Sequence, residues 1–222
     1  MAAIAALDDD VRSALHEFAR GADGPVTREA AAEAVGISRK LAAFHLDKLV
    51  AAGLLTARIE AVGAPRVGRA PKVYEPADAD IAVCVPPREP QLLAAILIDA
   101  VVGERPDETA DHAVLRVARE RGVAVGADER AASRPGRLGA ERALALATTL
   151  LRQHGYEPAR AADTVRLRNC PFHPMASAAP ELVCGLNQAF LAGVMEGLQA
   201  GASVEAVLAP RQGACCVELR AR

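Results

Sequence analysis

Four of the five cysteines in this chain lie in its last quarter, and they are the residues best suited to chemistry. They stand in three motifs: Arg168-Asn169-Cys170-Pro171-Phe172-His173, Glu181-Leu182-Val183-Cys184-Gly185-Leu186-Asn187 and Gly213-Ala214-Cys215-Cys216-Val217. With an odd cysteine count and no recognisable secretory signal, such a cluster favours a metal or iron–sulfur site over a disulfide framework.

The spacing of these cysteines bears on the kind of metal site. Thirteen residues separate Cys170 from Cys184, thirty separate Cys184 from Cys215, and no Cys-x-x-Cys pair occurs. Structural zinc sites usually use close pairs, whereas iron–sulfur clusters accept thiolates from distant elements. The spacing therefore favours a cluster, with zinc, another metal, or inert or redox-active thiols as alternatives. Cys84 stands alone among small apolar residues and is expected to be a buried hydrophobe outside the site.

Three kinds of element are expected to position the cysteines. Residues 164–170 alternate polar and apolar side chains, so Cys170 is expected at a strand end. A helix is expected to begin at Pro180 and to carry Cys184. Residues 203–208 and 214–219 predict a hairpin with Cys215 and Cys216 at the start of its second strand. Because neighbouring strand residues point to opposite faces, only one of this pair is expected to serve the site.

The middle of the chain predicts helices with one polar loop. Residues 78–90 indicate an extended connector, and residues 90–102 form a helix that is apolar nearly all round, which suggests a dimer interface. Further helices are expected over 107–122 and 139–154, with a polar loop over 127–138 between them.

The first third of the chain predicts three helices, over residues 9–20, 28–35 and 39–52. Thr27 and Ser38 are suitable N-caps, and Gly36 ends the second helix. Two helices joined by a tight turn that contains Gly are typical of a helix-turn-helix, whose second helix enters the major groove of DNA.

The basic residues of this region indicate an anionic partner. Residues 38–72 carry seven cations against two acids, a local charge of +5 in a chain whose formal charge is -2. A solvated helix face is the alternative to DNA contact. The candidate DNA-binding residues on the third helix are Ser38, Arg39, Lys40, Ala43, Phe44 and His45.

A hairpin is expected to follow, with strands over 53–60 and 73–75. The loop between them carries Arg66, Arg69 and Lys72 without an acid, so it suits a phosphate backbone. The segments Ile37-Ser38-Arg39, Phe44-His45-Leu46-Asp47-Lys48-Leu49, Gly53-Leu54-Leu55 and Gly68-Arg69-Ala70-Pro71-Lys72-Val73-Tyr74 resemble the winged-helix domain of ArsR-like regulators. The resemblance implies that this hairpin is a wing.

The three cysteine motifs are similar to those of the C-terminal domain of SufR-type iron–sulfur repressors. That resemblance implies a dimeric repressor with a [4Fe-4S] cluster on three cysteines, which controls genes for iron–sulfur cluster assembly. The ligands it implies are Cys170, Cys184 and one of Cys215 or Cys216, with Cys215 preferred. His173, the other cysteine or a small molecule would be the fourth ligand.

Together these observations predict a helix-rich α+β protein in three parts. They are a winged helix-turn-helix domain (1–77), a helical connector and dimerisation region (78–139) and an α+β cysteine-bearing sensor domain (140–222). The expected partners are a second copy of the chain and an inverted-repeat DNA operator. Neither a nucleophile–base–acid set nor a phosphate loop is found, so no enzyme is expected. No apolar run reaches the roughly 18 residues of a membrane span, and a cytoplasmic location is expected.

Overall fold

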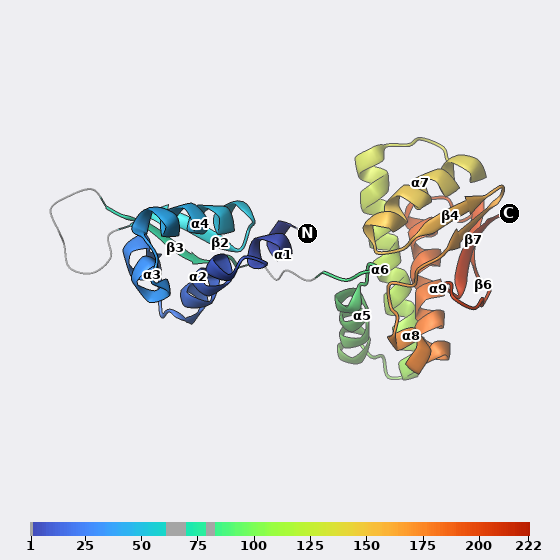
Figure 1. Ribbon diagram of the computed structural model, residues 1–222. Coiled ribbons are helices and arrows are strands. Elements are labelled where there is room, and N and C mark those ends of the chain that lie inside the picture. The colour runs from blue at the N-terminus through green and yellow to red at the C-terminus, as the bar shows by residue number, and fades with distance from the viewer. Residues whose placement is uncertain (1, 61–69, 79–82) are drawn as a thin grey trace. The chain divides into compact units, whose positions relative to one another are not determined.

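The computed structural model describes residues 2–60, 70–78 and 83–222, and it is 54% helical and 14% strand. The expected helix-rich α+β class is therefore confirmed. The chain divides into two compact units, residues 1–83 and 84–222, each with its own hydrophobic core (Figure 1). No helix in the described part of the chain is both long enough and apolar enough to cross a membrane.

The first unit contains helices α1 to α4 and a small antiparallel sheet (Figure 1). Its elements are α1 (Ala2–Leu7), α2 (Asp10–Gly21), β1 (Val26–Thr27), α3 (Arg28–Val35), α4 (Arg39–Ala51), β2 (Leu55–Ile59) and β3 (Lys72–Pro76). The strand order is β1-β3-β2. Strand β1 was not expected, because two residues are too few to show an alternating pattern of apolar and polar side chains. Only their pairing with β3 makes them a strand.

Local capping explains where α3 and α4 begin and end. The Thr27 hydroxyl accepts from the Ala30 N–H at 3.2 Å, and the Ser38 hydroxyl accepts from the Leu41 N–H at 3.2 Å. Gly36 ends α3 with φ 72°, a left-handed conformation that favours glycine. The predicted pair of helices and its glycine turn are thus confirmed, and Leu46 and Leu49 of α4 are fully buried.

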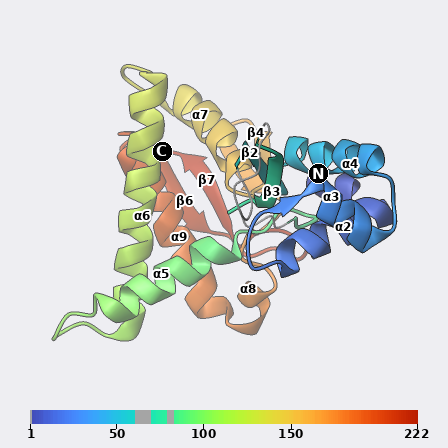
Figure 2. The same cartoon turned by 90° about the vertical axis from the view of Figure 1, so that its left-hand side faces the viewer.

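The second unit contains helices α5 to α9 and a four-stranded antiparallel sheet. Its elements are α5 (Pro90–Val102), α6 (Ala110–Ser133), α7 (Ala140–Gln153), β4 (Pro158–Ala161), β5 (Thr164–Leu167), α8 (Met175–Ala178), α9 (Pro180–Gly197), β6 (Val204–Leu208) and β7 (Val217–Ala221). The strand order is β4-β5-β7-β6. Helices α7 and α9 cover one face of the sheet, α6 packs on α9, and α5 packs on α6 (Figure 2).

Helix α6 is longer than the sequence predicted. Residues 127–133, expected to belong to a polar loop, continue the helix, and the Arg130 guanidinium donates to the Leu198 carbonyl at 2.9 Å. Strand β4 was not expected either, because Pro158 indicates only the end of the preceding helix. Helices α5 and α6, expected in a separate connector, share the core of residues 84–222 with the cysteine-bearing segments.

Four glycines bring the backbones of α6 and α9 into contact. A Cβ at Gly122 or Gly126 would overlap the backbone of α9 at Phe190 and Val194, and a Cβ at Gly193 or Gly197 would overlap the backbone of α6. Two Gly-x-x-x-Gly patterns therefore face each other and allow an approach that no other residue permits. This contact fixes α9, the helix that carries Cys184.

Candidate cysteine centre and basic helix face

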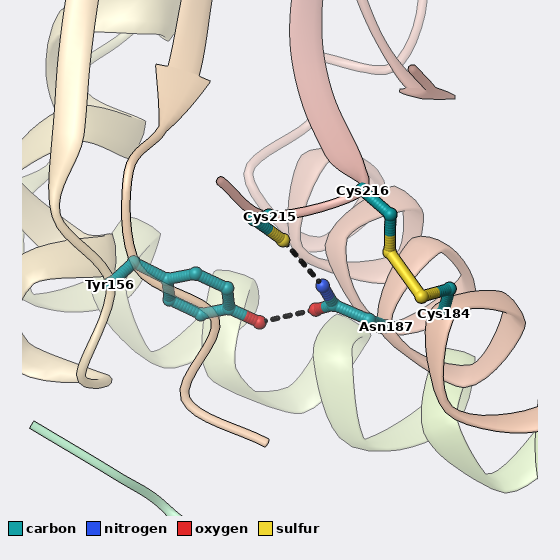
Figure 3. The surroundings of a disulfide bond; sticks show 5 residues. All are labelled: Tyr156, Cys184, Asn187, Cys215 and Cys216. Atoms are coloured by element: carbon teal, nitrogen blue, oxygen red, sulfur yellow. Dashed lines mark hydrogen bonds between the residues drawn. A yellow bond between two sulfur atoms is a disulfide. The ribbon is translucent and has the colours of Figure 1, made fainter. Parts of the chain in front are cut away.

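Four cysteines from three separate segments form two pairs, Cys184 with Cys216 and Cys170 with Cys215. Figure 3 shows Cys184, Cys215 and Cys216 of this set. Cys184 begins the second turn of α9 and forms a disulfide with Cys216, with Cα atoms 6.2 Å apart. The sequence favoured a metal site here and did not predict this bond. The other two cysteines, Cys170 and Cys215, are free thiols that share a hydrogen bond.

The hydrogen bond between Cys170 and Cys215 separates the acidities of the two thiols. The Cys215 thiol donates to the Cys170 sulfur, and this is the largest cause that lowers the pKa of Cys170. Together with the backbone N–H groups of Phe172 and His173 and the positive charge of Arg88, and against the opposing effect of burial, it brings that pKa to about 7. The same hydrogen bond and burial raise the pKa of Cys215. Cys170 is therefore the thiolate of the pair.

The segment that carries Cys170 is held by its neighbours. The Asn169 amide donates to the carbonyl oxygens of Pro87 and Gly155, each at 2.7 Å. The Arg88 guanidinium donates to the Cys170 carbonyl at 2.8 Å and also contacts the Asn169 side chain. These bonds fix the turn after β5, so the half-buried Cys170 sulfur faces Cys215 in one orientation.

Asn187 is the polar side chain at the centre of the site. It is fully buried, accepts from the Tyr156 hydroxyl at 2.5 Å, and donates from Nδ2 to the Cys215 sulfur at 3.1 Å (Figure 3). Burial raises the pKa of Tyr156, so its hydroxyl stays protonated and can donate. The sequence did not predict Tyr156 or Asn187 as residues of the site. An amide beside the apolar stripe of Val183, Leu186 and Phe190 is the signal that points to Asn187.

Cys215 and Cys216 lie before β7 rather than at its start. The Cys215 N–H donates to the Leu167 carbonyl at 2.9 Å, and the Cys216 carbonyl accepts from the Ala209 N–H at 2.7 Å. Both side chains face residues of α9, Cys216 toward Cys184 and Cys215 toward Asn187, as Figure 3 shows. Strand alternation does not apply to them because β7 begins at Val217.

The structure divides the predicted ligands into pairs. Cys216 contacts Cys184, and Cys215 contacts Cys170. Within the described residues, no three His, Cys, Asp or Glu side chains are grouped as a single metal ion would require. His173, a predicted fourth ligand, is exposed. Cys84 is exposed as well, so its expected burial is wrong.

Most predicted DNA-binding residues of α4 share one exposed face. Ser38, Arg39, Lys40 and Phe44 are exposed, and Ala43 is half-buried. His45 is only 8% exposed and its Nδ1 lies 4.0 Å from Asp9 Oδ1, so its expected place on the outer face is wrong. It precedes Leu46 on the inner side of the helix. The sequence did not single out Leu41, whose side chain is also exposed on α4.

The strand β3 is tied to α4 through Asp47. Its carboxylate accepts from Lys72 Nζ at 2.6 Å and from the Tyr74 hydroxyl at 3.0 Å. Lys72, predicted to contact phosphate, is therefore held by an acid of α4. Arg66 and Arg69, the other cations predicted for the hairpin loop, lie outside the described residues.

Comparison with family models, with curated proteins and with solved structures finds no match for this chain.

Proposed function

We propose that this chain is a DNA-binding transcription regulator, most simply a repressor, whose operator binding is controlled by its cysteine centre. The observation that carries the proposal is the outer face of α4, where Arg39, Lys40 and Phe44 are exposed together at the helix start after a tight Gly36 turn. In helix-turn-helix proteins the start of the second helix reads the major groove. We accordingly interpret residues 1–77 as a winged helix-turn-helix domain.

The ion pair between Asp47 and Lys72 gives the hairpin a structural role in this proposal. It links β3 to α4, so that the strands keep a fixed orientation relative to the helix we assign to the major groove. Arg66 and Arg69 are the cations we assign to the phosphate backbone, on the basis of sequence alone.

For the cysteine centre we propose a [4Fe-4S] cluster as the cofactor, with zinc as the alternative. The donor chemistry suits a cluster, because the four cysteines supply thiol sulfurs and backbone N–H groups already stabilise a thiolate at Cys170. Within the described residues the sulfurs are grouped in two pairs rather than in one metal site, so cluster binding requires the two pairs to close on each other. Cys170, Cys184 and one of Cys215 or Cys216 would hold the cluster, with the other cysteine or His173 as a fourth ligand. The disulfide must be reduced first, because both of its sulfurs belong to this set.

A bound cluster would supply an oxidant-sensitive bond between segments that are distant in sequence. Loss of the cluster would release segments that belong to different elements. Cys170 follows β5, Cys184 lies on α9, and Cys215 and Cys216 precede β7. Joining or releasing them changes how tightly the sheet is held to α9. We propose that this change alters operator affinity.

We further propose that the regulator is a homodimer. Ile98, Val101 and Val102 of α5 are 61%, 74% and 82% exposed, which makes an apolar surface on this helix. A symmetric dimer would read an inverted repeat with half-sites about one helical turn apart. Operators near genes for iron–sulfur cluster assembly are the first to test.

Anaerobic purification tests the cofactor. A brown protein with iron and acid-labile sulfide, which Cys170→Ser loses and Cys84→Ser keeps, supports the cluster. Cys84 is the matched control because it is an exposed cysteine outside the centre. A colourless protein without iron under strictly anaerobic conditions contradicts the cluster, and stoichiometric zinc in it would favour the alternative.

DNA selection from a random library tests the helix face. We expect Arg39→Ala to relax the preference at one position of the selected site, by about 1–3 kcal/mol of discrimination between bases. The control is Arg119→Ala, an exposed arginine of α6 paired with Glu196. If both variants select the same site as the parent protein, α4 does not read DNA.

The disulfide favours a second candidate, a regulator that responds to thiol oxidation without a cluster. Oxidation of the Cys184 and Cys216 thiols to the disulfide passes two electrons and two protons to an oxidant such as hydrogen peroxide. In that case a metal-free protein would change its operator affinity reversibly between peroxide and dithiothreitol, and Cys216→Ser would abolish the change.

A further inference from the structure

A second charged site lies in the C-terminal unit, on the strands β4, β5 and β7. A cavity of about 260 Å³ is lined by these strands and by the residues before β7. Four arginines line it, Arg160, Arg166, Arg168 and Arg211, against one acid, Glu218. This concentration of guanidinium groups is separate from the disulfide and from the basic face of α4.

The single acid of the cavity is already neutralised by an arginine of its own strand. Glu218 is 4% exposed, and its Oε1 accepts from Arg220 Nε at 2.7 Å. Arg166 lies directly opposite Glu218 in the sheet, but its Nε is 4.0 Å from Oε2, and Arg211 Nη2 is 3.8 Å from the same atom. Both distances exceed those of a hydrogen bond.

Arg166 and Arg211 therefore share the Glu218 carboxylate only through long ion pairs, and their hydrogen-bond donors are not used by it. Arg160 is bound to Glu141 of α7. Within residues 2–60, 70–78 and 83–222, the guanidinium groups of Arg166, Arg168 and Arg211 donate no hydrogen bond to another protein group. Glu218 attracts two of them toward one point without satisfying their donors.

We propose that this cavity binds a small oxyanion with two or more negative charges, of the phosphate or polycarboxylate class. The planar guanidinium fork matches both phosphate and carboxylate geometry, and it remains charged at any physiological pH. The ligand is held by Arg166, Arg168 and Arg211. Cys215 also lines the cavity, so an occupant lies beside the cysteine centre. The site does not depend on the DNA-binding proposal.

Isothermal titration calorimetry of the full-length reduced protein at low salt tests the site, with inorganic phosphate, pyrophosphate and citrate as probes. We expect saturable binding of one anion per chain. Arg166→Gln and Arg211→Gln should each weaken it about tenfold or more, because each removes a charge-assisted donor. Pyrophosphate binding without citrate binding identifies a phosphoryl ligand, and the reverse identifies a polycarboxylate.

Arg105→Gln is the matched control, because Arg105 is a 63% exposed arginine of the same unit that pairs with Glu120 and does not line the cavity. Arg211 lies outside the strands and is 51% exposed, so its variant is expected to fold, which a melting curve checks. The proposal is overturned if no anion binds saturably, if both cavity variants bind like the parent, or if the control loses as much affinity. Binding of duplex DNA but none of the three anions overturns it equally.

Discussion

At the scale of single residues, the cysteine centre depends on which thiol of a pair carries the proton. Cys215 is buried and stays protonated, and its S–H group donates a hydrogen bond to the Cys170 sulfur. Cys170 is half-buried and accepts from two backbone N–H groups as well. The reactive sulfur is therefore the one at the turn, while Cys215 tunes it.

This arrangement predicts the pH dependence of Cys170 alkylation. The thiolate forms as pH rises through about 7, so the rate should reach half of its plateau near that pH. Cys215→Ala removes the donor and should move the midpoint toward about 8.5, the value of an ordinary thiol. Iodoacetamide labelling of the peptide that contains Cys170, in a Cys84→Ser background, measures both profiles. Superimposable profiles would show that Cys215 does not tune Cys170.

The buried pair of Tyr156 and Asn187 allows a stability prediction. Tyr156→Phe leaves the Asn187 carbonyl oxygen without its donor in a dry environment, and we expect it to lower the free energy of unfolding by about 1–3 kcal/mol. Tyr74→Phe is the comparison, because its partner Asp47 is exposed and retains Lys72. Tyr74→Phe should lower the free energy of unfolding by less than Tyr156→Phe. Equilibrium urea unfolding measures both, and equal costs would contradict the argument.

At the scale of elements, the contact between α6 and α9 decides where the cysteine helix lies. Glycines normally weaken a helix, by about 1 kcal/mol each relative to alanine. Here Gly122, Gly126, Gly193 and Gly197 offset that cost because they let the two backbones touch. The sequence contains both pairs of spaced glycines, but it does not show which helix each pair contacts.

Two glycines of α9 predict opposite effects of the same substitution. A Cβ at Gly193 would overlap the Arg119 carbonyl, so Gly193→Ala should cost about 3 kcal/mol or more. A Cβ at Gly185 would meet only the Leu115 side chain, at 3.5 Å. Gly185→Ala should therefore be neutral or stabilise the helix by up to about 1 kcal/mol. Thermal and urea unfolding of the two variants compare them, and a stable Gly193→Ala protein would refute the close contact.

At the scale of the whole molecule, two separate hydrophobic cores suggest two units that fold independently. One core centres on Leu15, Leu46 and Leu49, and the other includes Ile96, Phe190 and Leu219. No described residue belongs to both cores. Each unit therefore buries its own set of apolar side chains and does not need the other unit to complete its core.

A fragment that consists of residues 84–222 should accordingly fold alone. We expect a cooperative melting transition by circular dichroism and, under oxidising conditions, a linkage between the Cys184 and Cys216 peptides in mass spectrometry. Thiol counting should find three free cysteines in this oxidised form and five after reduction. A fragment that melts without cooperativity would show that the first unit is needed for its fold.

The sequence by itself determined the elements whose signals are local. Ser38, Thr27 and Gly36 act within one turn of the backbone, so the amino-acid pattern suffices to place α3 and α4. Periodic apolar residues likewise placed α7 and α9, a nearly continuous apolar run placed α5, and alternation placed β5. Residue type alone also singles out the four cysteines of the candidate site as a group.

Only the tertiary structure decided which residues meet. Strands β1 and β4 exist because of partners elsewhere in the chain, and the inward position of His45 depends on how α4 packs. The pairing of Cys184 with Cys216, and of Cys170 with Cys215, follows from the antiparallel register of β5 with β7 and from the approach of α9. Contacts between distant segments depend on packing and loop geometry, which no local pattern encodes.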